Sequence, residues 1–351
     1  MRWFRCVDLC YDRDSYGFPL SGAKNDDMDA EVTSERFTEL SCLLGLSYLR
    51  GIGRRTIHSI AARNRALSIP LRRFFEMTKR DVVARYDLPG EVEIDLASRT
   101  RALDVAQRLM FRVLRAGVQV LTACDDDYPA SLLDSLGRDA PPVLYLSGNG
   151  SLLSKPGIAV VGTRSPSARA KRATSVCAGL IAAEGFNLVS GYADGIDTIA
   201  HRAALEADGT TSLVLPYGIL RFAPKPDFPV EAGSDQRILI VSEFNPDAPL
   251  SRHTALTRNR TICALANAVL VVETRERGGA VNAGRNALRL QKRLFVAAGP
   301  TPRSTSAGNR LLMREGAKPS VVFGPDAHPD LSALFDAARS RRVRPQLNIE
   351  F

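Results

Sequence analysis

From residue 157 onward, short apolar runs alternate with helix-like segments. The runs are rich in β-branched residues and nearly free of polar ones, which is typical of strands buried on both faces of a parallel sheet. The pattern therefore predicts an α/β fold with a Rossmann-like, doubly wound and mostly parallel sheet. We expect its strands at 158–161, 188–189, 212–215, 238–241, 268–272, 294–297 and 321–323.

The chain before this sheet has a helical pattern. Apolar residues lie near helical spacing at Phe37, Leu40, Leu43, Leu44 and Leu46. We therefore expect a small helical domain at 36–118 and a Rossmann-like domain at 119–325, which begins with short strands at 118–121 and 143–146. Residues 1–35 are predicted to form a poorly structured leader, and residues 326–351 a basic tail.

A glycine-containing turn, Gly51-Ile52-Gly53, joins two of the expected helices. Such a turn is the centre of a helix-hairpin-helix element, which offers backbone N–H groups to a DNA phosphate. A plain tight turn between packed helices is the alternative, and the residues leave both interpretations open.

Glycine turns follow several of the expected strands, at the sheet edge where ligands of doubly wound folds bind. Ser190 and Gly191 end one strand, and Gly195 precedes a helix-like segment at 196–206. A strand, a glycine turn and a helix N-terminus together make an anion pocket. Gly162-Thr163-Arg164-Ser165 follows the first main strand, but the G-x-G-x-x-G and Walker A patterns are absent, which disfavours ordinary NAD binding and ATP hydrolysis.

Three polar residues near these turns could be catalytic or structural. Asp197 and His201 lie four residues apart and share a helix face, which permits acid–base chemistry. A carboxylate in a first helical turn also binds backbone N–H groups, and no further catalytic group is evident nearby. We therefore expect Asp197, His201 and Glu273, which ends a later strand, to orient the pocket.

Two further motifs could bind phosphate. Arg258-Asn259-Arg260 is expected to open a helix that runs to Asn267, where two arginines would clamp a phosphate or a base edge. A surface cluster of ion pairs is the alternative. Gly278-Gly279 is expected to open another helix and to form a further anion turn.

The composition favours a nucleic-acid partner. The 351 residues are 45% hydrophobic, the formal net charge is +9 and the pI is about 9.5. A GC-rich genome would also enrich arginine, so the charge alone does not distinguish a nucleic-acid partner from a coding bias. The six cysteines show no CxxC pair, the four histidines form no recognisable zinc set, and no long apolar run spans a bilayer. We expect a cytoplasmic protein without a membrane contact.

Taken in order, the motifs resemble the DNA-processing protein A (DprA/Smf) family over roughly residues 37–324. The matching pieces are Asp127-Tyr128-Pro129, Val160–Arg164, Ser190–His201, Ser242-Glu243, Arg258-Asn259-Arg260, Val271-Val272-Glu273, and Gly308-Asn309 with Gly316-Ala317. The N-terminal helices look like the sterile-alpha-motif-like domain of that family.

The resemblance implies a single-stranded DNA-binding recombination mediator without a cofactor, and not an enzyme. Relatives protect single strands, work beside single-strand-binding protein, load the RecA recombinase and act as homodimers. Carried over by position, the DNA-binding residues would be Gly162, Thr163, Arg164, Ser165, Ser190, Gly191, Gly195, Lys225, Arg258, Asn259, Arg260, Gly278, Gly279 and Asn282.

Several departures from the family pattern indicate a divergent member. The usual serine-glycine-serine turn is Gly278-Gly279-Ala280 here, the Phe-Pro before the arginine motif is Ala255-Leu256, and we expect no C-terminal winged-helix domain. A role in phage defence is therefore an alternative to natural transformation. A nucleotide sensor or a phosphoribohydrolase-like enzyme on a related scaffold is the second hypothesis, although the Pro-Gly-Gly-x-Gly-Thr-x-x-Glu signature of such hydrolases is absent.

Overall fold

The computed structural model describes most of the chain between residues 34 and 340. The described residues are 34–88, 92, 94–226, 228, 235–299, 301–321 and 329–340. The leader expected at 1–35 therefore lies outside the described residues, apart from its last two positions, which belong to the first helix. The end of the expected tail, from residue 341, also lies outside them.

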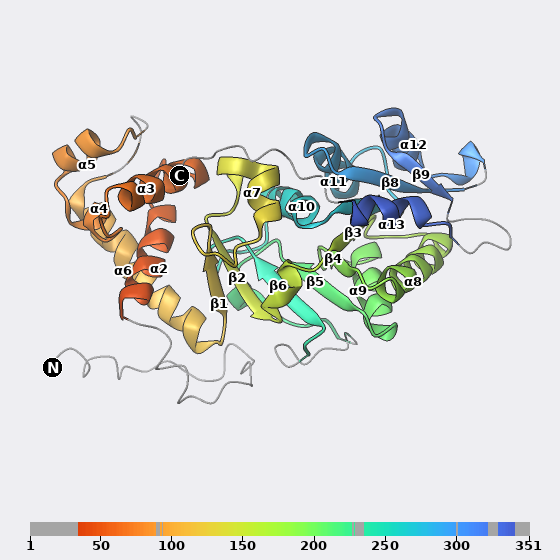
Figure 1. Ribbon diagram of the computed structural model, residues 1–351, viewed down its shortest axis with the longest axis horizontal. Coiled ribbons are helices and arrows are strands. Elements are labelled where there is room, and N and C mark those ends of the chain that lie inside the picture. Colours follow the sequence, from red (N-terminus) through yellow and green to blue (C-terminus); the bar gives the residue numbers. More distant parts are fainter. Residues whose placement is uncertain are drawn as a thin grey trace.

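The N-terminal part is a helical domain, seen on the left of Figure 1. Its two longest helices, α2 and α6, pack along each other, and the side chain of Asp95 caps α6 by accepting a hydrogen bond from the backbone N–H of Ser98 at 2.8 Å. Its helices, among the residues described, are α2 (Ser34–Ser47), α3 (Arg54–Ala66), α4 (Arg73–Glu76), α5 (Lys79–Arg85) and α6 (Leu96–Arg115).

A nine-stranded sheet forms the centre of the second domain, in the order β1-β2-β6-β5-β4-β3-β7-β8-β9. β1 and β2 run antiparallel to their neighbours, and every other pair is parallel, so the predicted mostly parallel sheet is confirmed. The strands are β1 (Gln119–Thr122), β2 (Val143–Gly148), β3 (Gly157–Val161), β4 (Asn187–Ser190), β5 (Thr210–Val214), β6 (Ile238–Ser242), β7 (Ala268–Val271), β8 (Arg293–Ala298) and β9 (Lys318–Val321).

Helices cover both faces of the sheet, as the doubly wound prediction requires. One face packs against α8 (Ala168–Ala183), α9 (Ile196–Glu206) and α13 (Ser332–Arg339). The other face packs against α7 (Ala130–Leu136), α10 (Arg252–Leu265), α11 (Gly279–Arg289) and α12 (Ala307–Arg314). Helix α13 lies within the segment expected to be a basic tail, and its buried Leu334 and Phe335 extend the core of the sheet. Short 3₁₀ turns complete the fold: η1 (Gly137–Asp139), η2 (Gly150–Leu153), η3 (Ile219–Arg221) and η4 (Pro302–Ser304).

The order of the strands places a topological switch point between β3 and β7. The chain proceeds outward from β3 to β6 and then returns to pair β7 with the other side of β3. Loops at the carboxyl ends of β3 and β7 therefore diverge to opposite faces of the sheet, which opens a crevice of the kind that binds ligands in this class of fold. At the far edge, β9 presents Lys318 and Pro319, both exposed.

The helical domain and the sheet share one apolar core. Residues of α2, α3 and α6 belong to the same cluster of buried side chains as Tyr145 of β2, Leu213 of β5 and Ile240 of β6. Gly51 and Gly53 of the turn before α3 are exposed, and Gly51 has a φ of 84°. Among the described residues, no helix combines the length and the apolar character needed to cross a membrane.

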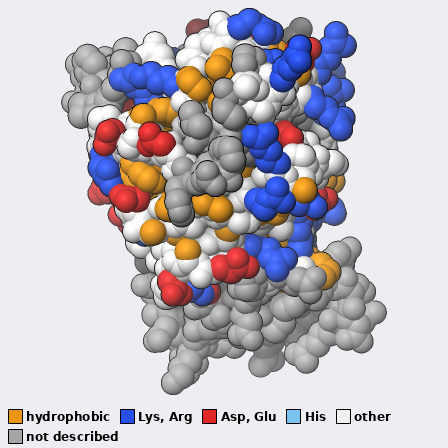
Figure 2. All heavy atoms as spheres, turned by 90° about the vertical axis from the view of Figure 1, so that its right-hand side faces the viewer, with side chains coloured by type: hydrophobic (Ala, Val, Ile, Leu, Met, Phe, Trp, Pro, Cys, Tyr) orange, Lys and Arg blue, Asp and Glu red, His pale blue; other side chains and the backbone are white. Residues whose placement is uncertain are grey.

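Basic side chains gather in one part of the face shown in Figure 2. Figure 2 looks onto the end of the molecule that carries β9, and Lys and Arg side chains gather in the upper and right-hand parts of this face. Exposed basic residues of the C-terminal elements include Arg289, Arg293, Arg314 and Lys318.

Candidate nucleic-acid interface

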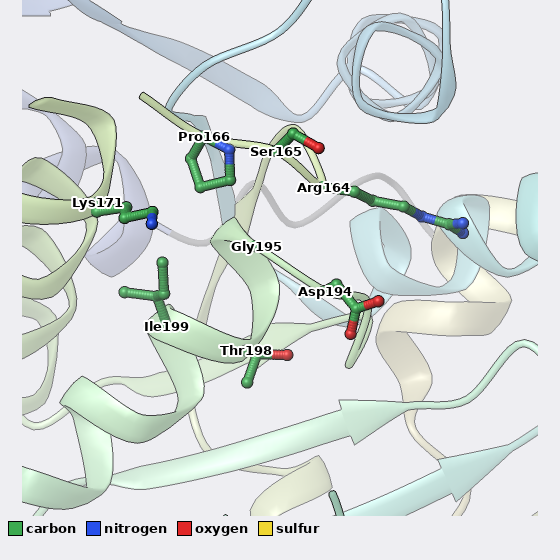
Figure 3. A pocket seen from close by; sticks show the side chains of 8 residues that line it. All are labelled: Arg164, Ser165, Pro166, Lys171, Asp194, Gly195, Thr198 and Ile199. Atoms are coloured by element: carbon green, nitrogen blue, oxygen red, sulfur yellow. The ribbon is translucent and has the colours of Figure 1, made fainter. Parts of the chain in front are cut away.

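An open cavity of about 480 Å³ lies at the carboxyl ends of β3 and β4 (Figure 3). Two loops form it, one from β3 to α8 and one from β4 to α9, together with the first turns of both helices. Its lining residues are Arg164, Ser165, Pro166, Lys171, Asp194, Gly195, Thr198 and Ile199. The predicted residues Arg164, Ser165 and Gly195 are thus brought together at one place.

The β3–α8 loop is fastened to the neighbouring strand β7. The backbone N–H of Thr163 donates to the carbonyl oxygen of Glu273 at 2.8 Å, and the N–H of Ser167 donates to the Glu273 carboxylate at 2.9 Å. The hydroxyl of Ser167 in turn caps α8 by accepting from the N–H of Ala170. Glu273 therefore fixes the loop across the switch point, which fits the orienting role expected for it.

Cations stand at opposite sides of the cavity. Arg164 and Lys171 are both exposed, and Figure 3 shows them on opposite sides of the cavity, with the Lys171 side chain reaching toward it and the Arg164 side chain extending outward. Neither side chain forms an ion pair with another described residue. Both can therefore meet an incoming anion without first breaking an internal contact.

The β4–α9 loop approaches the β3 loop closely through Gly195. Its φ of 79° lies in the left-handed region, and a Cβ atom there would stand 2.5 Å from the carbonyl oxygen of Thr163 and 2.6 Å from that of Arg164. That Thr163 carbonyl accepts the N–H of Ile196, the first residue of α9. Glycine is therefore required at 195 for the two loops to form the cavity wall.

Lys225 lies at the rim of the cavity. Its Nζ atom is 2.8 Å from the Asp194 carboxylate and 2.7 Å from the Thr198 hydroxyl, and it lies 4.7 Å from the ring centroid of Tyr192. The Tyr192 hydroxyl accepts the backbone N–H of Lys225 at 2.7 Å. Lys225 therefore sits beside the cavity, but Asp194 already neutralises its charge.

Arg258 occupies a buried position. The predicted helix start at Arg258 is wrong: α10 begins at Arg252, with a capping box between Ser251 and Thr254, so Arg258 lies in its middle. The residue is 4% exposed, and its guanidinium donates to the carbonyl oxygens of Gly191 and Val214. Arg258 thus ties the ends of β4 and β5 to α10 from beneath the cavity.

The other two residues of the motif face different elements. The Asn259 amide donates to the carbonyl oxygen of Gly279 at 3.0 Å, and it lies 3.4 Å from Oδ1 of Asn282. Arg260 reaches the carboxylate of Asp139 at 3.4 Å. Asn259 and Asn282 therefore shape the start of α11, where Gly278 and Gly279 are exposed, on the β7 side of the switch point.

Asp197 lies beneath the β4–α9 loop. Its carboxylate accepts the backbone N–H of Ala193 at 3.4 Å. Burial raises the pKa of Asp197, and the positive charge of Arg258 opposes that rise. Asp197 does not line the cavity, and its geometry fits an orienting role.

His201 is fully buried and pairs with Thr211 rather than with Asp197. The Thr211 hydroxyl donates its one hydrogen to the carbonyl oxygen of Leu188, so at 2.6 Å it accepts from Nδ1 of the imidazole. Nε2 of His201 has no hydrogen-bond partner among the described residues. Burial, assisted by the charges of Lys225 and Arg258, lowers the pKa of His201 to about 3.

Ser190 and Gly191 are both buried at the end of β4. The Ser190 hydroxyl donates to the carbonyl oxygen of Val160 at 2.5 Å, so it links the ends of β4 and β3. A Cβ atom at Gly191 would collide with Arg258 and Asp197. These two residues shape the cavity from below and present no side chain to it.

Sequence reasoning missed Lys171, Asp194 and Thr198. Lys171 lies one helical turn after Ser167, which caps α8. This spacing could have indicated that Lys171 lies near the loop that forms the cavity. The link between Asp194 and Lys225 joins residues 31 positions apart and left no local signal.

Comparison with known proteins finds relatives of the sheet-containing part of the chain. The family model of DNA recombination-mediator protein A matches residues 119–324. A relative from Mycobacterium tuberculosis is 34% identical over 250 residues, which are 65% of this chain and 62% of that protein. DNA processing protein DprA of Streptococcus pneumoniae is 37% identical over 204 residues, covering 58% of this chain and 70% of that protein.

A solved structure extends the likeness to the fold. The X-ray structure of DNA processing protein A from Streptococcus pneumoniae superimposes with a TM-score of 0.64 at 27% identity, covering 86% of this chain and 98% of that one. The family match spans more than half of the present sequence and includes all the loops that form the cavity. The chain belongs to the DNA recombination-mediator protein A (DprA/Smf) family.

Proposed function

We propose that the chain binds single-stranded DNA as a recombination mediator, with the sugar-phosphate backbone in the cavity at the ends of β3 and β4. The observation that best supports this proposal is the pair of exposed cations, Arg164 and Lys171, on either side of a cavity whose wall contains a glycine turn. An arginine fork binds phosphate oxygens in a planar, bidentate manner, and a lysine adds a mobile point charge.

The shape of the cavity favours a single strand over a duplex. A flexible strand can bend its backbone into the cavity, whereas a duplex is stiff and keeps its bases inside. Family membership supports a recombination mediator, and the net charge of +9 supports a nucleic-acid partner of either form. We further propose that the protein protects the bound strand and displaces single-strand-binding protein from it or works beside that protein. As a homodimer, it would then pass the strand to the RecA recombinase.

The arrangement of the polar residues argues against turnover of a nucleotide. Asp197 and His201 are buried beneath the cavity, and the Glu273 carboxylate accepts the N–H of Ser167. A phosphoribohydrolase would need an acid or base that reaches the substrate, and the carboxylate that lines the cavity, Asp194, is paired with Lys225 at 2.8 Å. We therefore assign these three residues to orienting the loops, and we assign no catalytic residue.

Fluorescence anisotropy with a labelled oligothymidylate and a matched hairpin duplex tests the proposal across a salt series. We expect tight binding to the single strand, weaker binding to the duplex, and a steep loss of affinity between about 50 and about 200 mM salt. No binding at about 50 mM salt would contradict it. Incubation with nucleoside monophosphates and NAD, followed by chromatography, tests the enzymatic alternative, which release of free base or ADP-ribose would support.

A further inference from the structure

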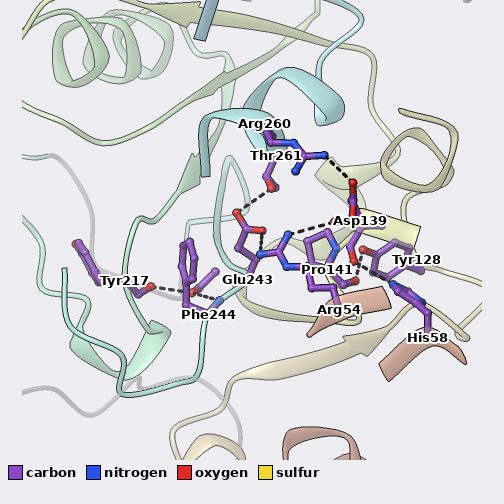
Figure 4. Close-up of polar contacts among 12 residues, drawn as sticks. Arg54, His58, Tyr128, Asp139, Pro141, Tyr217, Glu243, Phe244, Arg260 and Thr261 are labelled. Carbon is purple, nitrogen blue, oxygen red and sulfur yellow. Dashed lines mark hydrogen bonds and ion pairs between the residues drawn. The ribbon is translucent and has the colours of Figure 1, made fainter. Parts of the chain in front are cut away.

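The helical domain contacts the sheet through an ion pair at the end of β6, in which the carboxylate is buried and the arginine is partly exposed. Nη2 of Arg54, the first residue of α3, lies 2.6 Å from Oε2 of Glu243 (Figure 4). The Glu243 side chain is 0% exposed. Nη1 of the same guanidinium donates to the carbonyl oxygen of Asp139 at 3.3 Å. Arg54 is therefore committed to the junction between the two domains.

Glu243 connects this junction to α10. Its second carboxylate oxygen, Oε1, accepts a hydrogen bond from the Thr261 hydroxyl at 2.8 Å. Arg258 lies three residues before Thr261 on the same side of α10, and the negative charge of Glu243 stabilises its buried guanidinium. One carboxylate thus holds Arg54 from the helical domain and supports the helix that carries Arg258.

Arg258 connects α10 to the cavity wall. Its guanidinium binds the carbonyl oxygen of Gly191, the first residue of the loop in which Asp194 and Gly195 line the cavity. The path from α3 to that loop therefore consists of the Arg54–Glu243 contact at 2.6 Å, the Glu243–Thr261 contact at 2.8 Å, one turn of α10 between Thr261 and Arg258, and the hydrogen bond from Arg258 to Gly191.

We propose that Arg54 is a positioning residue for the DNA site, which acts through Glu243 and Arg258 on the β4–α9 loop. This inference rests on the proposed function, because it concerns the same cavity. Without Arg54, the Glu243 carboxylate would keep its hydrogen bond from Thr261 but lose the cation that pairs with it. A buried carboxylate without a paired cation must rearrange or bind a proton. Either response shifts α10 and loosens the grip of Arg258 on Gly191.

The test compares Arg54→Ala with Arg55→Ala. Arg55 belongs to the same turn of α3 and pairs with Asp139 at 2.7 Å, but its side chain is 74% exposed and does not touch Glu243. Asp139 also binds Arg260 of α10 at 3.4 Å, so Arg55→Ala tests this second route to α10; the half-buried Asp139 carboxylate keeps Arg260 as its cation when Arg55 is removed. Arg54→Ala is expected to speed amide hydrogen exchange at residues 191–195 in the DNA-free protein and to weaken oligothymidylate binding about three- to tenfold. Arg55→Ala is expected to leave both unchanged, and Arg54→Lys, which keeps the charge, should recover part of the loss.

The salt dependence separates positioning from direct contact. A positioning residue leaves the slope of log affinity against log salt unchanged, whereas loss of a phosphate contact reduces it by about 0.7 on a single strand. A reduced slope, or unchanged exchange and affinity in folded Arg54→Ala, would overturn the proposal. If Arg54→Ala does not fold, Glu243→Gln gives the same test, because it keeps the Thr261 contact and removes the charge. If the unmodified protein binds no single strand, the proposed function fails, while the exchange measurement still decides the coupling.

Discussion

The guanidinium of Arg258 donates a hydrogen bond to the carbonyl oxygen of Gly191, so the middle of α10 fixes the start of the loop after β4. The same guanidinium binds the carbonyl oxygen of Val214 at the end of β5. One buried side chain therefore sets the spacing of two strand ends beneath the cavity, which makes it a determinant of stability as well as of binding.

Arg258→Met should destabilise the fold by about 3 kcal/mol, because Asp197 would remain buried without its cation. Denaturant unfolding measures the change. Asp197→Asn in the same chain should recover part of the stability, because it removes the unpaired carboxylate. A double variant as unstable as the sum of the two single variants would show that the two charges are not coupled.

Arg164→Ala should weaken single-strand binding about tenfold and lower the salt slope by about 0.7, because an exposed phosphate contact is lost. Arg172→Ala is the control, since Arg172 is an exposed arginine of α8 that does not line the cavity. Anisotropy titrations at several salt concentrations measure both. Equal losses in the two variants would place the DNA elsewhere.

Asp194→Asn should tighten single-strand binding by about two- to fivefold at low salt, because it releases Lys225 and removes a negative charge from the rim. Asp208→Asn changes the net charge equally at an exposed position that pairs with Arg237, away from the cavity. Titrations of both variants under identical conditions make the comparison. The same gain in both would reflect net charge rather than the rim.

Gly195→Ala should abolish most of the binding and destabilise the protein more than Gly185→Ala does. The two glycines have nearly equal φ values of 79° and 78°, but a Cβ atom meets nothing within 4 Å at Gly185. Gly185→Ala should therefore cost only the left-handed strain of about 1–2 kcal/mol. Thermal unfolding and anisotropy measure the pair, and equal stabilities would contradict the close approach of the two loops.

Acid should destabilise the fold through His201. Its pKa is about 3 in the folded chain against an ordinary 6.5, so between these values the unfolded chain binds more protons and stability falls as pH drops below 6.5. The expected loss at pH 5 is roughly 2 kcal/mol. His201→Leu should show a shallower decline between pH 7 and 5 in denaturant titrations. An equally steep decline would mean that other groups carry the acid sensitivity.

The sequence was most informative where local chemistry decides the structure. The helix expected at 196–206 begins and ends at those residues, because Gly195 provides the left-handed turn and an apolar face follows it. Gly278-Gly279 opens α11 as expected, and Gly308 and Gly316 lie at the two ends of α12.

Burial of charged residues could not be predicted from the sequence. Arg258 was expected at a helix start, where it would clamp a phosphate, yet Ser251 caps the helix two turns earlier. Its surroundings come from Gly191, Val214 and Glu243, which are remote in the chain and adjacent only in the folded sheet. The partner of His201 is likewise a threonine on the neighbouring strand β5.

The edge of the sheet at β9 bears on how copies of the chain can associate. Pro319 has no N–H to offer an additional strand, and Lys318 places a charge beside it. The edge is therefore poorly suited to template a strand from another molecule, which protects it from open-ended aggregation. A second copy would have to meet this end of the protein through side chains rather than through a shared backbone ladder.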